Sequence, residues 1–457
     1  MVSTQFVGCV ILLGGMDIKL KDGRLAKRWL ILVRSQMKSA APLVAGVGAL
    51  PSLTRPFAAT QAAWRFYNNE RVELCELVEP LRAYVREQLL ASPVAFVLIA
   101  HDWCKVSFPG HRFRKDLAEL PNASNIGYEL TTSLAISAEN GAPLAVVEMH
   151  MQTKDACLST RAPAPARVPH LDQMLPTMEA SRGWNLGKPL VHVIDREADS
   201  VGHYRLWHAA GHQVLIRADD RKVLWNGERQ KLSDIRQELL RSGRFQAAGA
   251  ALYHGRVARL EVAETEVVLD LPARTTLPQK TKSGRKKKVS VPGPPLTMRL
   301  ILTRVVDSEG RLLAQWNLLS NVPADWADAR QLAHCYYWRW RIESYFKLLK
   351  SHSFQLEDWL QETGPAIARR LLVVSMAATT VWQLQADDSA PAVELKQLLV
   401  RLSGRQTKRK APFPAPALLA GLWTLLAMLD TLELYDLPTL KALIQQIPLP
   451  IPLLKSG

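Results

Sequence analysis

The chain has 457 residues, more than the roughly 250 to 300 at which a single hydrophobic core stops growing, so we expect several domains. Its 58 Lys and Arg against 42 Asp and Glu give a net charge of +16, which favours a polyanionic partner, nucleic acid before an anionic membrane surface. The sequence has no run of about 18 apolar residues, which a membrane-spanning helix would need. Its five scattered cysteines favour a reducing cytoplasm over a disulfide framework or a zinc knuckle.

The first 92 residues are predicted to form a helical DNA-binding domain. The apolar run Phe6–Gly15 has the length of a signal-peptide core, but no Lys or Arg precedes it and no small-residue cleavage site follows. We interpret it as a packed segment or an extension before a start at Met16. From there to residue 38, basic residues alternate with leucines, which is typical of a solvated helix face or of a DNA-contacting helix.

Residues 93–218 are predicted to form the first part of an α/β core. Apolar runs at 94–100, 130–137, 143–151 and 189–194 are typical of strands. Asp102 and Asp195 follow the first and last of these runs, and ligand and catalytic groups gather at strand ends in open sheets covered by helices. Taken singly, each aspartate is better interpreted as a helix N-cap or turn residue.

Residues 219–318 are predicted to be a β-rich insertion, because runs such as ARLEVAETEVVLDL and PLTMRLILTRVV are alternating or continuously apolar. Between those runs lies a basic low-complexity segment. It is either a disordered, solvated excursion or an arm along a phosphate backbone, and such arms often order on binding. Its basic residues are Lys280, Lys282, Arg285, Lys286, Lys287 and Lys288.

Residues 319–365 are predicted to complete the core, with one helix over about 328–351. Five polar residues recur there at three- or four-residue spacing, within a sector of roughly 80° on an exposed face. They are Tyr336, Arg339, Glu343, Lys347 and Lys350. An ordinary surface ion pair between Glu343 and Lys347 explains part of this pattern. The opposite stripe, predicted to be packed, comprises Cys335, Trp338, Ile342, Phe346 and Leu349.

Residues 366–457 are predicted to be a helical region that packs or dimerises, since they carry two long apolar helical patterns. The three carboxylates Asp102, Asp195 and Glu343 carry the chemical prediction. Hard divalent cations such as Mg²⁺ prefer oxygen ligands. Two such ions can activate a water or a 3′ hydroxyl and stabilise the leaving oxygen at a phosphorus atom.

The spacing Tyr336-(2)-Arg339-(3)-Glu343-(6)-Lys350 and the string Asp195-Arg196-Glu197-Ala198-Asp199 resemble motifs of the DDE transposases of bacterial insertion sequences, the IS four family. The resemblance spans residues 16–365. It implies an RNase H-like core, a mixed sheet with flanking helices, interrupted by the β-rich insertion. Asp102 would lie on the first strand of that core, Asp195 on the fourth, and Glu343 on the helix after the insertion.

The resemblance also implies a set of roles. The three carboxylates would be catalytic and bind two Mg²⁺ or Mn²⁺ ions, while Tyr336, Arg339 and Lys350, with Lys347 as a helper, would hold DNA phosphates. Arg217 would lie near the site. Trp316 has the strand position from which relatives stack a flipped base, although a tryptophan packed in a β-core is an equally good interpretation. Asp102 is followed by Trp103-Cys104-Lys105, which departs from the hydroxyl-rich turn of some relatives.

The resulting hypothesis is a bacterial cut-and-paste transposase in the cytoplasm, associated with the nucleoid when bound. It would bind the inverted ends of its element, cleave them and join the 3′ hydroxyls to target DNA, with double-stranded DNA and a second copy of the chain as partners and no membrane. Two alternatives remain open. One is an RNase H-like nuclease without strand transfer, and the other is a catalytically silent, sequence-specific DNA-binding protein.

Overall fold

The computed structural model describes residues 20, 22–38, 56–90, 92–108, 110, 113–120, 126–253, 256–280, 286–351, 353–405 and 413–446. The chain forms two compact units. We call Glu73–Lys347 the sheet unit, and Met1–Val72 with Leu348–Gly457 the helical unit. The domain boundaries expected from the sequence do not coincide with this division and stay a prediction. The segment Phe6–Gly15 lies outside the described residues.

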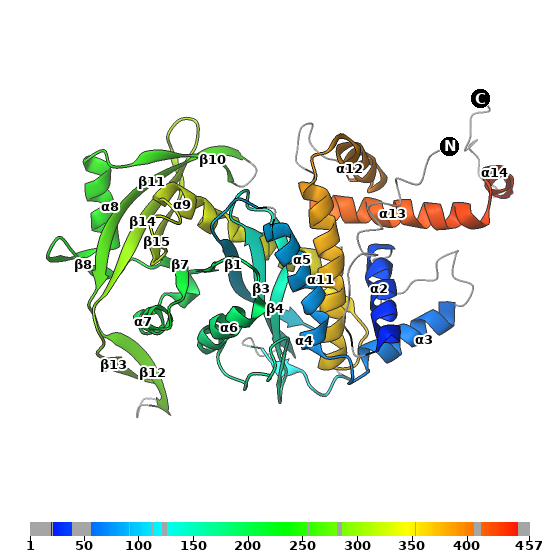
Figure 1. Ribbon diagram of the computed structural model, residues 1–457, viewed down its shortest axis with the longest axis horizontal. Helices are drawn as coiled ribbons and strands as arrows, with labels where there is room; N and C mark the ends of the chain where they lie inside the picture. Colours follow the sequence, from blue (N-terminus) through cyan, green and yellow to red (C-terminus); the bar gives the residue numbers. More distant parts are fainter. Residues whose placement is uncertain are drawn as a thin grey trace. The chain divides into compact units, whose positions relative to one another are not determined.

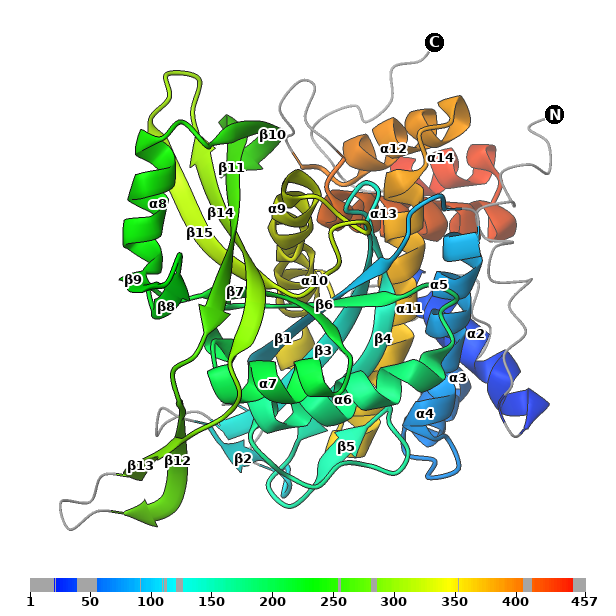
Figure 2. The same ribbon diagram turned by 60° about the vertical axis from the view of Figure 1, so that its left-hand side comes forward.

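The sheet unit is built on one large mixed sheet (Figures 1 and 2), to which thirteen strands belong in the part of the chain that the structure describes. Its first half has the strand order β4-β3-β1-β6-β7. β1 runs antiparallel to β3 and parallel to β6, and β6 runs parallel to β7. These strands are β1 (Val97–Ser107), β3 (Ile126–Ser137), β4 (Pro143–Gln152), β6 (Leu190–Ile194) and β7 (Gln213–Ala218), with the short β2 (Ala118–Glu119) and β5 (Cys157–Ser159) alongside.

Helices cover this half of the sheet because its strands are apolar on both faces. Residues Val97–Ala100 of β1 and Val191–Ile194 of β6 are buried throughout. α6 (Met174–Ser181) and α7 (Val201–Ala209) lie side by side (Figure 2), and their apolar side chains join one core with β6 and β7. α4 (Leu74–Leu77) and α5 (Glu79–Leu90) precede β1, and Arg82 of α5 donates to the Val147 carbonyl of β4 at 2.9 Å.

The sequence places the end of the first strand too early. β1 does not stop before Asp102 but continues to Ser107, paired with β3 along its whole length. Its pairing with β6 ends earlier, at Ala100 opposite Val193. Asp102 therefore lies just past the point where the pairing with β6 ends, and not at the end of β1 itself. Asp195 directly follows β6, as predicted.

The insertion is rich in strands, as expected, but it joins the same sheet through the pairing of β7 with β15. It also contains a helix, α8 (Leu232–Arg241), that the sequence analysis missed. This helix is short, and only Leu232, Ile235 and Leu239 are buried. The strands are β8 (Lys222–Trp225), β9 (Glu228–Lys231), β10 (Gln246–Tyr253), β11 (Arg256–Leu269), β14 (Leu296–Val306) and β15 (Leu312–Ser320), with a separate ribbon of β12 (Ala273–Lys280) and β13 (Lys286–Val291).

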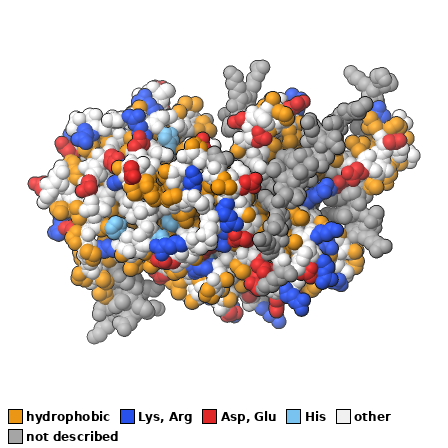
Figure 3. Space-filling view, in the orientation of Figure 1, with side chains coloured by type: hydrophobic (Ala, Val, Ile, Leu, Met, Phe, Trp, Pro, Cys, Tyr) orange, Lys and Arg blue, Asp and Glu red, His pale blue; other side chains and the backbone are white. Residues whose placement is uncertain are grey.

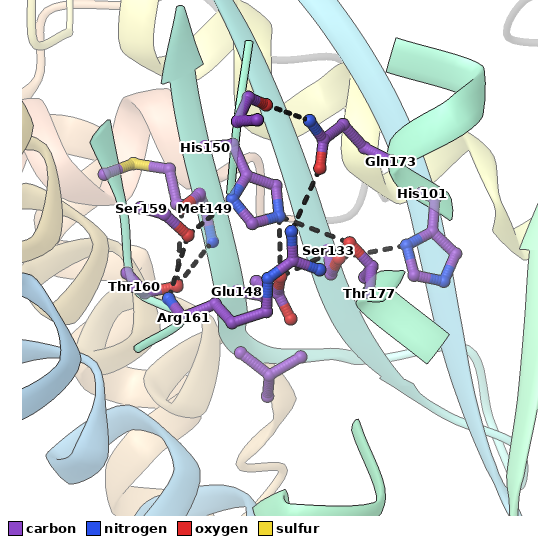
Figure 4. Close-up of polar contacts among 12 residues, drawn as sticks. His101, Ser133, Glu148, Met149, His150, Ser159, Thr160, Arg161, Gln173 and Thr177 are labelled. Atoms are coloured by element: carbon purple, nitrogen blue, oxygen red, sulfur yellow. Dashed lines mark hydrogen bonds and ion pairs between the residues drawn. The ribbon is translucent and has the colours of Figure 1, made fainter. Parts of the chain in front are cut away.

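A buried polar network ties the central strands together (Figure 4). His101 of β1 contacts Ser133 Oγ of β3 at 2.9 Å and His192 of β6 at 2.8 Å through its two ring nitrogens. Burial lowers the pKa of His101 to about 3 and that of His192 well below its usual value, so both rings are neutral near pH 7. Nearby, the fully buried Glu148 lies 2.6 Å from His150 Nε2. The His101–His192 contact fixes β1 against β6, the strands that lead to Asp102 and Asp195.

The prediction of a single helix over 328–351 is wrong. The segment forms two helices, α9 (Ala329–Trp338) and α10 (Trp340–Lys350), which meet at Arg339. The backbone N–H of Arg339 bonds to the Tyr336 carbonyl, an i→i+3 bond that tightens the turn. The predicted exposed stripe is also wrong in part, since Tyr336 and Arg339 are buried. On the opposite stripe, Cys335, Ile342, Phe346 and Leu349 are buried as predicted, and Trp338 is half-buried.

The helical unit is organised around α11 (Gly364–Ala386), a long helix that is buried over most of its length. It contains two buried arginines. Arg369 donates to the carbonyls of Val72 and Tyr67, and Arg370 lies over the Trp359 ring at 4.1 Å. The other helices are α2 (Gly23–Lys38), α3 (Pro56–Tyr67), α12 (Ala390–Leu402), α13 (Ala415–Leu434) and α14 (Leu437–Gln445).

α13 is long and apolar enough to cross a membrane by length and composition, which the sequence analysis did not anticipate. One such helix is weak evidence for a membrane span, since core helices of soluble proteins meet the same test. One side of α13 packs within the helical unit. Asp430 forms a 2.6 Å ion pair with Lys38 of α2, and the Trp423 indole donates to the Gln36 carbonyl.

The close approach of α12 and α13 gives a stability prediction. A Cβ added at Gly421 would lie 1.9 Å from the Leu399 carbonyl oxygen. We expect Gly421→Ala to destabilise the protein by about 1 to 3 kcal/mol, because the backbone of α12 must move. The gain of about 1 kcal/mol in helix propensity is too small to offset this. Thermal unfolding measures the effect as a lower midpoint.

The matched control is Gly23→Ala at the start of α2, in the same unit, where an added Cβ meets nothing within 4 Å. It should leave the unfolding midpoint unchanged or slightly raised. Equal shifts for the two variants would contradict the packing argument.

Candidate active site

Two of the predicted carboxylates lie at the same edge of adjacent parallel strands. The last paired residues of β1 and β6 are Ala100 and Val193, and Asp102 and Asp195 each lie two residues beyond them. Asp195 is also the N-cap of the 3-10 helix η4 (Arg196–Ala198), where its Oδ1 accepts from the Glu197 N–H at 2.8 Å. The capping interpretation of Asp195 is therefore correct, and it leaves the second carboxylate oxygen for other contacts.

Arg339 joins the third carboxylate to this edge. Its guanidinium donates through Nη1 to Asp102 Oδ2 at 3.1 Å and through Nη2 to Glu343 Oε1 at 2.8 Å. The Arg339 side chain is 8% exposed, whereas those of Asp102 and Glu343 are 16% and 36% exposed. One buried cation thus bridges a carboxylate on β1 and a carboxylate on α10, with both acidic groups facing more open space than the arginine.

The electrostatics of Asp102 show that the three carboxylates influence one another. The pKa of Asp102 is raised to about 6, mainly by burial, and Arg339 opposes this rise by stabilising the ionised form. The negative charges of Asp195 and Glu343 contribute smaller increases to the same pKa. Asp102 is therefore a carboxylate with an unfavourable environment for its own charge, close to two others, and it gains from a nearby cation.

The oxygens fit a hard divalent cation in kind, because Asp102, Asp195 and Glu343 are all carboxylates. Within the described ranges, no group of three or more His, Cys, Asp or Glu side chains is close enough to hold a metal ion. Arg339 occupies the space between two of the three. A shared metal site at these carboxylates requires the Arg339 guanidinium to leave at least one of them.

The predicted DNA-contacting residues divide into two groups. Tyr336, Arg217 and Trp316 lie with Arg339: the Trp316 and Tyr336 rings are 5.7 Å apart, and Arg339 lies 6.0 Å from the Tyr336 ring centre. Burial raises the pKa of the Tyr336 hydroxyl, and the charges of Arg339 and Arg217 lower it. Trp316 is half-buried on β15 and packs against an apolar cluster of the insertion, so its core-packing interpretation holds.

The second group comprises Lys350 of the motif and Lys347, its proposed helper. Lys347 is exposed one turn after Glu343 on α10. Lys350 ends the same helix and lies 3.8 Å from Glu357, within the helical unit.

Four residues to which the sequence analysis gave no role form a chain of contacts that begins beside Asp102. The Trp103 indole, next to Asp102 in sequence, donates to Glu197 Oε2 at 2.8 Å and stacks on His170 at a ring distance of 3.9 Å. His170 Nδ1 in turn lies 3.2 Å from Glu129 Oε1. The Trp103–Glu197 bond ties β1 to the turn that carries Asp195. The sequence analysis noted both partners, Trp103 as a departure from relatives and Glu197 within the motif string, but no local signal pairs them.

The bridge yields a pH-dependent stability prediction. The folded-state pKa of Asp102, about 6, is above its unfolded value, so ionising this group lowers stability as pH rises through about 6. Arg339→Met removes the opposing cation and should raise that pKa further. The unfolding midpoints of wild type and Arg339→Met should therefore differ moderately at about pH 5 and by more at about pH 8. At the higher pH the variant should lose about 3 kcal/mol of unfolding free energy.

The control is the double variant Arg339→Met with Asp102→Asn, which has no carboxylate at position 102. The unfolding midpoint of the double variant should differ from that of Asp102→Asn by the same amount at both pH values. A difference between wild type and Arg339→Met that is the same at both pH values would contradict the bridge.

Comparison with known proteins identifies the family. The chain matches the Transposase DDE domain family over residues 144–380, which is more than half of its 457 residues. The match includes Asp195 and Glu343 and begins after Asp102. A solved structure of a piggyBac transposase synaptic complex with hairpin DNA is similar over 95% of this chain and 77% of that chain, at 11% identity and a TM-score of 0.35, too low to carry weight. No curated protein sequence matches. On the family match, the chain belongs to the DDE transposases.

Proposed function

We propose that the protein is a cut-and-paste transposase that cleaves the inverted ends of its insertion sequence and joins their 3′ hydroxyls to target DNA. The observation that carries this proposal is the Arg339 bridge, which brings Glu343 to Asp102 while the register of β1 and β6 brings Asp195 to the same edge. Family membership gives the general chemistry, metal-dependent cleavage of DNA. The IS four family is the subgroup proposed from the motifs.

The strand order supports the proposal that the first half of the sheet is an RNase H-like core. Among the strands of five or more residues, β1, β3, β4, β6 and β7 are the first to fifth, and their spatial order is 3-2-1-4-5. Asp102 then belongs to the first strand and Asp195 follows the fourth. These are the positions that the resemblance implies, and the insertion follows the fifth strand.

In this proposal Asp102, Asp195 and Glu343 hold two Mg²⁺ or Mn²⁺ ions. When bound, such ions activate the attacking water or 3′ hydroxyl and stabilise the leaving oxygen. The chain's own residues position the DNA. The charges of Arg339 and Arg217 both act on Tyr336, and these two cations would hold the scissile phosphate through charge-assisted hydrogen bonds. Lys347 and Lys350 would contact phosphates further along α10, and Trp316 would stack a flipped base.

Arg339 would bind the carboxylates in the free protein and the DNA phosphate in the complex. With no DNA or metal bound, its guanidinium neutralises Asp102 and Glu343, whose charges would otherwise repel. With both bound, divalent ions would replace it at the carboxylates and the phosphate would receive its hydrogen bonds. The buried Tyr336 ring beside it limits how far the side chain moves. Two element ends require at least two copies of the chain, so we also propose a homodimer in the DNA complex, acting in the bacterial cytoplasm.

The test is a cleavage and joining assay on labelled duplexes that carry the ends of the gene's own element, with Mg²⁺, Mn²⁺ or chelator. Wild type should nick the element boundary and join labelled ends to a plasmid. Asp195→Ala and Glu343→Gln should each lower the cleavage rate by at least about a thousandfold, because both remove a proposed metal ligand.

The matched control is Glu238→Gln, the same substitution at an exposed position of α8 in the same unit, which should cleave like wild type. Cleavage without joining would favour the nuclease alternative. Sequence-specific binding without cleavage under any metal would favour a silent DNA-binding protein. Full cleavage by Glu343→Gln would contradict the proposed site.

A further inference from the structure

One edge of the insertion lies beside α9, the helix that leads to Arg339 (Figures 1 and 2). This edge is β10, which pairs with β11 and with no other strand in the part of the chain that the structure describes. An edge strand leaves backbone N–H and carbonyl groups without strand partners. On the face shown in Figure 3, basic and acidic side chains are interspersed, so surface charge assigns the insertion no role there. Its contacts with α9 do assign it one.

The Tyr337 hydroxyl of α9 takes the place of a neighbouring strand at this edge. It donates to the Leu252 carbonyl at 2.6 Å and accepts from the Leu252 N–H at 3.1 Å, so it bonds both backbone groups of one residue. A hydroxyl can do this because it has one donor and two acceptor lone pairs. The Tyr337 ring is half-buried and packs against the apolar cluster to which Ala248 of β10 and Ala333 of α9 belong. Packing therefore holds the ring, and two directional bonds hold its hydroxyl.

A β-bulge in β10 supplies a second contact with α9. The pairing of β10 with β11 passes from Ala247 to Gly249 and leaves out Ala248, and Gly249 has a φ of +113°. Such a bulge turns backbone groups out of the strand ladder. The Ala248 carbonyl accepts from His334 Nε2 at 2.5 Å. Because His334 lies three residues before Tyr337, both side chains share one face of the helix, and the strand is shaped to meet that face at two points.

A second anchor lies on the other side of Arg339. Arg341 Nε donates to the Gly141 carbonyl, in the turn between β3 and β4, at 2.9 Å. The Trp338 ring fills the space beside the same glycine, since a Cβ added at Gly141 would lie 2.3 Å from that ring. Tyr337 is therefore tied to the insertion, whereas Trp338 and Arg341 are tied to the first half of the sheet. Arg339 lies between these anchors, in the turn that separates α9 from α10.

The place of this turn matters because Arg339 bonds two carboxylates at once. Its bonds to Asp102 and Glu343 are 3.1 and 2.8 Å long, and hydrogen bonds weaken steeply when their distance or angle departs from narrow limits. Apolar packing of α9 does not impose such limits, since the hydrophobic effect is non-directional. The two bonds of Tyr337 to the insertion are directional, and Tyr337 lies only two residues before Arg339 in the chain.

We propose that Tyr337 is a positioning residue of the candidate active site, through which the insertion fixes Arg339 between its two carboxylates. Tyr337 acts through Arg339 and is not itself catalytic. The inference rests on the proposed function for the chemistry that these carboxylates perform, but the placement of Arg339 can be measured without it. The insertion thereby takes part in cleavage as a support for the site, independently of any contact with DNA.

The first test measures the coupling between Arg339 and Asp102 in the full-length protein without metal or DNA. A double-mutant cycle of Arg339→Met and Asp102→Asn on the free energy of unfolding gives this coupling. Tyr337→Phe removes the hydroxyl and keeps the packed ring. In that background the coupling should fall to less than about half its wild-type size, because the turn is no longer held and the bonds of Arg339 lengthen. Tyr84→Phe, the same substitution at a buried tyrosine of α5, is the matched control and should leave the coupling unchanged.

The second test measures cleavage of the element ends. Tyr337→Phe should lower the cleavage rate at saturating DNA about tenfold and leave the Kd for the duplex within about twofold, because positioning affects the reaction and not the DNA-binding surface. The effect should depend on Arg339. In an Arg339→Lys background, where a compact ammonium cannot bond both carboxylates as the guanidinium does, Tyr337→Phe should lower the remaining rate by less than about twofold.

Two results of the first test would overturn the inference, whether or not the protein cleaves DNA. They are an unchanged coupling in Tyr337→Phe and an equal fall in Tyr84→Phe, which would indicate general destabilisation. In the second test, equal losses of rate with Arg339 and with Lys at that position would show that Tyr337 does not act through Arg339. A reduced coupling in a protein that never cleaves element ends would support the positioning of Arg339 and contradict the proposed function alone.

Discussion

The candidate site depends on one buried guanidinium. Arg339 donates to Asp102, 237 residues away in sequence, and to Glu343 one helical turn further on. Removing one partner from a buried ion pair costs about 3 to 5 kcal/mol, since the remaining charge is left without compensation. The turn between α9 and α10 exists at the residue that makes both bonds. The same buried residue thus lies at the break between the two helices and holds two carboxylates close to each other.

A second constraint fixes the other pair of carboxylates. Asp102 and Asp195 lie at the same sheet edge because β1 and β6 are parallel neighbours, and the buried His101–His192 contact joins the same two strands. Both histidines are neutral near pH 7, so this contact does not add charge to the site. The Trp103–Glu197 bond then holds the turn after β6 against β1. A functional site needs supporting residues that restrict movement, and these side chains would provide them for the proposed site.

Sequence reasoning located most strands and the three carboxylates, because alternating or continuous apolar runs and strand-end aspartates are local signals. It missed features that depend on partners far away in the chain. Nothing local in α9–α10 indicates that Arg339 turns inward, since its partner Asp102 lies on β1. The continuation of β1 to Ser107 was missed because His101, Asp102 and Lys105 interrupt its apolar run, and its last residues are paired only with β3. The short amphipathic α8 was hidden between strands.

The central claim is that Asp102, Asp195 and Glu343 act as one cation site once Arg339 moves aside. Mn²⁺ binding, followed by electron paramagnetic resonance in the presence of uncleaved duplex DNA, tests it most directly, because it does not depend on turnover. The account predicts that Asp102→Asn, Asp195→Asn and Glu343→Gln each weaken Mn²⁺ binding by at least about tenfold. Glu238→Gln should bind Mn²⁺ like wild type. Wild-type affinity in any one of the three site variants would contradict a shared site.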